Sequence, residues 1–277
     1  MKEYYYLVSS LYDLTLDTGK MPILLEEFED FCKEELTDED FLDLKKLFLF
    51  NDIKNVINYK KSDDKYLLPA FYTEEEFLEN LKDTDSFFTF LSEYFFNKDA
   101  GKKIYPELQE IDELTLLFYE NLSTIAKDFV EDYFIFELNL KNITTAMACR
   151  KANIPYTNKI IPFGDYYEFI LKSNTPDFGL GSDFNFIEKL ISAYDKDDLL
   201  ETEKTIEDIR WEYLDSRTEN KFFSKDFVFA YAIKLLSVRR WFSMSKEKGE
   251  ELLNKLIEEI KGNIKFPQEF LKVGGRM

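Results

Sequence analysis

The stretch from Phe129 to Arg150 constrains the fold of this chain more than any other. Its apolar side chains recur at steps of four and three residues, the spacing of one stripe along a helix. Asn153 can adopt a left-handed backbone conformation and Pro155 cannot continue a helix, so we expect the helix to end there. The stretch is predicted to be a buried core helix with a polar edge. The stripe consists of Phe129, Tyr133, Phe136, Leu140, Ile143 and Met147.

Two groups of side chains are candidates for contact with a partner. At about 100° per residue, Asp132, Asn139 and Arg150 share one flank of the expected helix. The second group is the basic and aromatic run Arg239-Arg240-Trp241. That run could stack on a partner, or its arginines could form ordinary ion pairs with carboxylates of the chain.

The composition favours an all-α fold. Gly and Pro number only 9 and 7, which argues against a turn-rich β fold, and 28 Phe with 17 Tyr predict a core built largely of rings. Residues 1–25 fit either a strand or a helical turn. The tract 106–152 is too long for one helix of a compact domain, so we expect it to break or to form a spine shared by two lobes. Expected helix-start residues are Thr37, Thr73 with Glu76, Asp85, Asp183, Ser224, and Ser245 with Glu247.

A short internal echo predicts repeated lobes. The run Asp52-Ile-Lys-Asn-Val56 resembles Asn139-Leu-Lys-Asn-Ile143, and Ala232-Ile-Lys234 is a thinner third copy. The copies are separated by roughly a third of the chain, as expected for three similar helical units. We therefore predict a single three-lobed domain, with approximate lobes 1–105, 106–182 and 183–277.

The charge balance bears on the choice of partner. Asp and Glu outnumber Lys and Arg by 55 to 36, for a net charge of −19. Such a surface repels nucleic acid and anionic lipid headgroups. We see no secretion signal and no apolar run long enough to span a bilayer, and Cys32 and Cys149 fit buried free thiols in a reducing cytoplasm. We expect a cytoplasmic protein that meets a membrane only through another protein.

The sequence offers few candidates for catalysis. It contains no histidine, which removes Ser-His and Cys-His triads and histidine-bearing zinc sites. The runs Asp63-Asp64 and Asp195–Asp198 could hold magnesium, but each lies beside Lys and is better interpreted as a solvated charge run. We therefore predict no catalytic residue, no cofactor and no metal. An all-helical enzyme that works through carboxylates and a metal stays open as an alternative, as does a free-standing adaptor.

A family resemblance adds a specific expectation. With Glu137-Leu-Asn139-Leu-Lys-Asn142 on the long helix, Lys151 after Arg150, and Tyr231-Ala-Ile-Lys234 before Arg239-Arg240, the chain resembles the C-subunit family of V/A-type ATPases, whose eukaryotic members are called d-subunits. It departs from that family at Leu235–Val238, where the family tends to place a Glu among basic residues.

The two ends of the chain resemble a narrower group. Tyr4–Leu11 and Phe266–Phe270 are similar to a bacterial group of proteins encoded beside V-type ATP synthase subunits. The resemblance implies an all-helical funnel of three lobes with a non-catalytic role. That role is to seat the rotor shaft on the membrane rotor ring, so that torque passes between them. It also implies that Asn139 and Arg150 occupy the family's polar positions on the helix.

Overall fold

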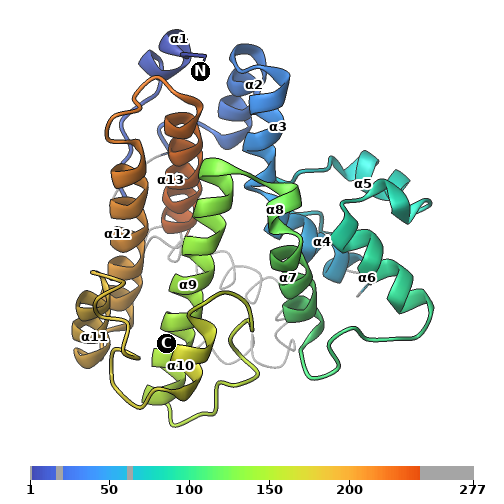
Figure 1. The fold of residues 1–277 in the computed structure, drawn as a ribbon. Coiled ribbons are helices and arrows are strands. Elements are labelled where there is room, and N and C mark those ends of the chain that lie inside the picture. The colour runs from blue at the N-terminus through green and yellow to red at the C-terminus, as the bar shows by residue number, and fades with distance from the viewer. Residues whose placement is uncertain (1, 17–20, 61–64, 244–277) are drawn as a thin grey trace, which may run out of the picture. The chain divides into compact units, whose positions relative to one another are not determined.

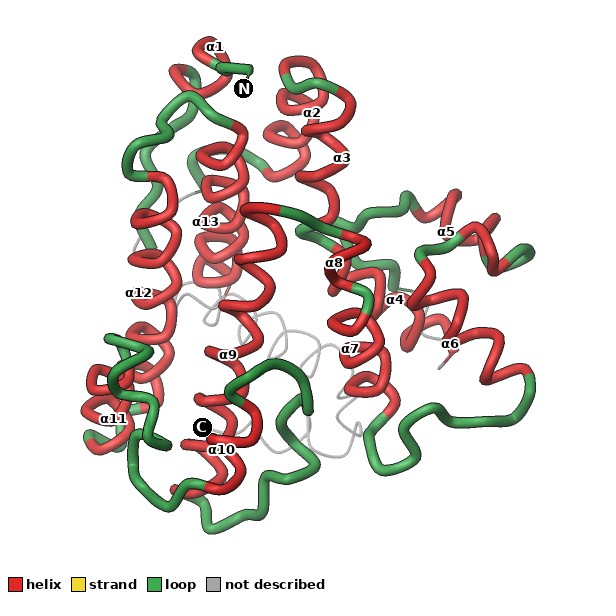
Figure 2. The backbone as a smooth tube through the Cα atoms, in the orientation of Figure 1, coloured by secondary structure: helices red, strands yellow, loops and turns green. Residues whose placement is uncertain are grey.

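A computed structural model describes residues 2–16, 21–60 and 65–243, and all the regular structure in those ranges is helical (Figures 1 and 2). The predicted all-α class is confirmed. The helix expected from Ser245 lies outside the described residues. The elements are α1 Tyr5–Ser9, α2 Leu25–Glu35, α3 Asp38–Lys46, α4 Leu49–Lys60, α5 Glu74–Asn80, the 3₁₀ turn η1 Thr84–Ser86, α6 Thr89–Asp99, α7 Glu110–Glu120, α8 Leu122–Ile125, α9 Asp128–Lys151, α10 Tyr167–Lys172, α11 Ile187–Asp195, α12 Leu199–Thr218 and α13 Lys225–Ser243.

The chain divides into two compact units. The first comprises Met1–Leu11 and Leu25–Ile233, and the second comprises Tyr12–Leu24 and Lys234–Met277. The packing described below belongs to the first unit. The division into three lobes stays a prediction. None of the helices in the described ranges combines the length and the apolar character needed to cross a bilayer.

Side-chain caps begin several helices where the sequence predicts them. The Thr37 hydroxyl accepts the Asp40 N–H at 3.2 Å, and Thr73 with Glu76 forms a reciprocal capping box. The Ser224 hydroxyl accepts the Phe227 N–H at 3.4 Å. Each cap satisfies a backbone donor that the first turn of a helix leaves without a partner.

Two expected caps are wrong. Asp85 lies inside η1, and α6 begins only at Thr89 because Phe87 adopts an extended backbone conformation between them. Asp183 lies in a turn, where its own N–H bonds to the Leu180 carbonyl, and α11 begins only at Ile187. In both cases a turn intervenes between the acid and the helix.

The tract 106–152 breaks into three helices, as one of the two expectations required. Ala126 is extended between α8 and α9, so α9 begins at Asp128. Its far end is closed by backbone hydrogen bonds from Asn153 to the Arg150 carbonyl at 3.0 Å and from Ile154 to the Cys149 carbonyl at 2.8 Å. Asn153 has a φ of 54°, which is the left-handed conformation that such a helix end needs.

Helix α9 is buried on two sides. On one side Phe134 contacts Phe118 of α7 and Phe50 of α4, with ring centroids 4.9 and 5.5 Å apart. The predicted stripe faces the other side, where Phe136, Leu140, Ile143 and Met147 pack with residues of α10, α11 and α12. One helix therefore contributes side chains to both clusters, while a spine shared by two lobes stays a prediction.

The internal echo corresponds to a repeated contact. The Asn55 side chain accepts the Leu67 N–H at 2.8 Å and donates to the Leu67 carbonyl at 3.1 Å. The Asn142 side chain makes the same pair of bonds to Ile161, both at 2.9 Å. Each Asn is 2% exposed. Each pair of hydrogen bonds, which we call a clamp, satisfies the backbone of a non-helical segment that would otherwise be buried without partners.

Asp52, three residues before Asn55, extends the first clamp. Its carboxylate accepts the Phe71 N–H at 2.7 Å and the Tyr72 N–H at 3.2 Å. Burial raises the pKa of this carboxyl to about 7, and the two backbone donors offset only part of that shift. In the second copy the matching residue is Asn139.

The clamp predicts a difference between two neighbouring asparagines. We expect Asn142→Ala to lower the free energy of unfolding by about 2 to 5 kcal/mol, because it leaves the Ile161 N–H and carbonyl without a hydrogen-bond partner. Asn139→Ala is the matched control, and we expect a cost of at most about 1 kcal/mol because Asn139 bonds to no described residue. Urea unfolding followed by circular dichroism measures both, and equal losses would contradict the assignment.

Asp52 predicts a pH dependence of stability. Its folded pKa lies above the unfolded value of about 4, so its contribution is complete at low pH and is lost as the pH rises towards 7. Relative to Asp52→Asn, the wild-type protein should lose up to about 1.4 kcal/mol of unfolding free energy per pH unit between about pH 5 and 7. The other titrating groups occur in both proteins and so largely cancel in the comparison. Urea unfolding at several pH values should show this, and a pH-independent or rising difference would contradict it.

Candidate functional site

A groove of about 570 Å³ lies between α9, the turn 183–186 and α12. We call it the α9–α12 groove. Its floor is apolar and aromatic, and its rim is mostly acidic. It is lined by Glu131, Asp132, Ile135, Phe136, Asn139, Asp183, Phe184, Asn185, Phe186, Ile209, Glu212, Tyr213, Ser216 and Arg217.

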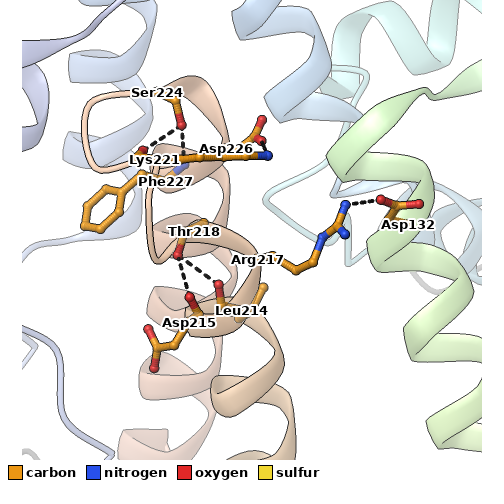
Figure 3. Close-up of polar contacts among 9 residues, drawn as sticks. All are labelled: Asp132, Leu214, Asp215, Arg217, Thr218, Lys221, Ser224, Asp226 and Phe227. Atoms are coloured by element: carbon orange, nitrogen blue, oxygen red, sulfur yellow. Dashed lines mark hydrogen bonds and ion pairs between the residues drawn. The ribbon is translucent and has the colours of Figure 1, made fainter. Parts of the chain in front are cut away.

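Three contacts set the register of α9 against α12. Arg217 of α12 forms an ion pair with Asp132 of α9 (Figure 3). The Phe136 and Tyr213 rings then stack in parallel, with centroids 3.8 Å apart. Arg210 next pairs with Glu137. Residue numbers rise along α9 as they fall along α12, so the two helices are antiparallel.

The Arg210 contact is a buried ion cluster. The guanidinium binds both oxygens of Glu137 and lies 2.8 Å from Glu207, whose side chain is 1% exposed. Burial disfavours the charge, but the carboxylates outweigh it and hold the pKa of Arg210 well above its usual value. The pKa of the adjacent Tyr133 is also raised, first by burial and then by Glu137. The cluster joins α9 to α12 beside the groove.

The rim of the groove is only partly neutralised. Asp132 pairs with Arg217, and Glu212 accepts a hydrogen bond from Lys189 at 2.6 Å. Within the described part of the chain, Glu131 and Asp183 form no ion pair. Four carboxylates and one guanidinium line the groove, so its potential is negative and suits a cationic ligand.

Asn139 is the polar group of the floor. It lines the groove, and the residue is only 6% exposed. Its side chain forms no hydrogen bond with another described residue. An amide carries two donors and two acceptor sites, so this side chain can bind a backbone N–H and a carbonyl at the same time.

The candidate residues from the sequence fall in different places. Asp132 and Asn139 meet in the α9–α12 groove, Asp132 exposed on its rim and Asn139 buried in its floor. Arg150 shares their flank of the helix but not their surroundings. It donates to the Thr175 and Ser173 carbonyls at 2.6 and 2.5 Å, and it stacks on the Phe178 ring. Arg150 therefore has a structural role in anchoring the segment after α10.

The second candidate group belongs to the second unit. Arg239 and Arg240 are exposed near the end of α13, and Trp241 is half-buried. A role in contacting a partner stays a prediction for all six candidates: Asp132, Asn139, Arg150, Arg239, Arg240 and Trp241.

Sequence reasoning missed much of the groove. The α12 residues Arg217 and Tyr213 are not among the sequence candidates, and Asp183 appears there only as an expected helix-start residue. Helical spacing indicates part of the groove lining, because Ile209, Tyr213 and Arg217 follow one another at steps of four and so share one face of a helix. What the sequence lacked was the register of α12 against α9.

The acidic run at residues 195–198 has structural partners. Asp198 caps α12 by accepting the Glu201 N–H at 3.0 Å, and Asp197 lies 2.6 Å from Lys151. Residues 195–198 are exposed and run from the last residue of α11 to the residue before α12, which agrees with the interpretation as a solvated charge run, whereas Asp63-Asp64 lies outside the described residues. No group of three or more His, Cys, Asp or Glu suited to a metal occurs in the described ranges.

The two arginines of α12 predict contrasting stability effects. Arg210→Ala removes the guanidinium that contacts both oxygens of Glu137 and the buried Glu207 carboxylate, and we expect a loss of about 3 to 5 kcal/mol in unfolding free energy. Arg217→Ala is the matched control on the same helix. Its ion pair is exposed, so its loss should cost less than about 1 kcal/mol. Chemical denaturation measures both, and similar losses would contradict the distinction.

Comparison with known proteins gives one match. The model of a family described as "protein of unknown function (DUF2764)" matches residues 1–264. No curated protein and no solved structure matches the chain.

Proposed function

We propose that this chain, which belongs to the DUF2764 family, is a non-catalytic central-stalk component of a V/A-type ATPase. In this role it binds the rotor shaft and seats it on the membrane rotor ring, at the cytoplasmic face of the membrane. The observation that carries the protein-binding role is the α9–α12 groove, with its aromatic floor and incompletely neutralised acidic rim. Aromatic groups in concave surfaces are typical anchors of protein interfaces.

The rotary assembly is proposed from the residues that carry the family resemblance. Glu137, Asn139 and Asn142 are all on α9, where they form the buried ion cluster, a polar point in the groove floor and a loop clamp respectively. These roles agree with a helix that both supports the fold and presents a surface. The helical fold is also what the resemblance implies.

The charge of the chain supports the choice of a membrane-protein partner over a lipid surface. Cytoplasmic loops of membrane proteins are enriched in Lys and Arg, so a rotor ring offers a basic rim. A protein with a net charge of −19 is drawn to that rim and repelled by anionic lipids around it. Complementary charge of this kind chiefly speeds and orients docking.

Docking should depend on the ring and on salt. We expect the protein to bind proteoliposomes that carry the rotor ring and to ignore anionic liposomes without it. The association rate should fall steeply between about 0.05 and 0.5 M salt, because screening shortens the range of the attraction. Stopped-flow fluorescence measures the rate, and flotation measures binding.

Three outcomes would count against this proposal. Binding to bare anionic liposomes, or an association rate indifferent to salt, would contradict docking on a basic rim. Purification without any rotor component would contradict the assignment to the central stalk and would favour a free-standing adaptor.

A further inference from the structure

Asn139 is only 6% exposed and lines the groove, and its side chain forms no hydrogen bond with a described residue. Its side-chain nitrogen and oxygen are not among the fully buried polar atoms, so the groove gives access to them. Polar groups on a packed helix face are nearly always hydrogen-bonded, either to protein or to water. The neighbouring polar residues of α9 follow that rule. Asn142 binds Ile161 and Glu137 binds Arg210, each within hydrogen-bond distance. Asn139 is therefore placed to bond with something that enters the groove.

The chain itself shows what this helix position binds. Asp52 occupies the matching position of the internal echo, and it holds the consecutive N–H groups of Phe71 and Tyr72. Asn55 and Asn142 occupy a second matching position, and both hold the backbone of a non-helical segment. Three of the four matched positions thus bind backbone amides. Asn139 is the fourth.

The walls of the groove indicate the side chains of the segment that would lie there. Glu131 and Asp183 offer carboxylates that no described residue neutralises. Phe184 and Tyr213 are only partly buried, so their rings can accept the alkyl stems of Lys or Arg and cation–π contacts from the charged heads. An acidic segment would meet repulsion from the same rim.

We infer that the α9–α12 groove binds a non-helical, Lys- or Arg-bearing segment of a partner protein, with the Asn139 amide hydrogen-bonded to the segment's backbone. The inference deepens the proposed function and rests on it for the identity of the partner. The chemistry of recognition rests on the groove alone. Charge complementarity selects the segment, and Asn139 sets its position along α9.

A random dodecapeptide library displayed on phage provides the probe. Selection on the immobilised full chain should enrich peptides rich in Lys or Arg with an aromatic or aliphatic residue nearby. The recovered peptides are then synthesised, and their dissociation constants are measured by fluorescence anisotropy. Recovery of no peptide, or of peptides without basic residues, would overturn the inference.

Variants separate the two modes of recognition. Asn139→Leu should raise the dissociation constant about tenfold or more, because the backbone loses its partner. Glu131→Gln with Asp183→Asn should slow association and flatten its dependence on salt. Lys141→Gln is the matched control, since Lys141 is exposed on the same helix and outside the groove, and it should leave the dissociation constant unchanged. Circular dichroism and urea unfolding confirm that each variant is folded.

Spermidine tests the role of the backbone. It has positive charge but no peptide group, so it should bind weakly and respond little to Asn139→Leu. Spermidine binding as tight as the peptides, or peptide binding unaffected by Asn139→Leu, would overturn the inference.

The two proposals fail in different ways. If the chain co-purifies with rotor components but its groove takes no basic peptide, the inference fails and the proposed function stands. If the groove binds basic peptides through Asn139 but no rotor component co-purifies, the recognition chemistry stands and the proposed function fails.

Discussion

The burial of α9 on two sides is the constraint on which the rest of this structure depends. A helix with one solvated face can leave its polar side chains in water, but a helix packed on both sides must give them partners. On α9 those partners come from distant parts of the chain. Asn142 is satisfied by the loop at Ile161, and Glu137 is satisfied by Arg210 of α12. The polar residues of α9 therefore decide which segments must lie beside it.

The repeated clamp shows how one local solution serves two parts of the fold. An Asn on a buried helix offers a donor and an acceptor at once, which matches the N–H and carbonyl of a single residue in a passing segment. Asn55 and Asn142 both use that match. The two copies of the echo differ at the position three residues before each Asn. Asp52 holds its own chain, whereas Asn139 faces the groove. In this proposal, a position that stabilises one copy is used for recognition in the other.

Acidic residues have different roles in the buried cluster around Arg210 and on the exposed rim of the groove. Around Arg210, the carboxylates of Glu137 and Glu207 share one guanidinium, on a side chain that is only 14% exposed, and the Arg210–Glu137 pair joins α12 to α9. On the groove rim the ion pairs are exposed and contribute little to stability. The rim carboxylates instead shape the field that a partner meets. Stability and recognition thus use the same residue types on the same pair of helices.

The sequence by itself determined the helical class, the core stripe on α9, the left-handed end at Asn153 and the caps at Thr37, Thr73 and Ser224. These are local properties, which depend on residues within one or two helical turns. It also contained the echo that became the Asn55 and Asn142 clamps, although spacing alone did not say what they hold.

Only the tertiary structure decided the groove, the role of Arg150 and the second buried face of α9. Arg217 meets Asp132, and Arg210 meets Glu137, across more than 70 residues of chain. Such pairs depend on the register between helices, and that register is set by the whole packed core. Asp132, Asn139 and Arg150 share a flank by helical geometry, but what covers each part of that flank is a property of the fold.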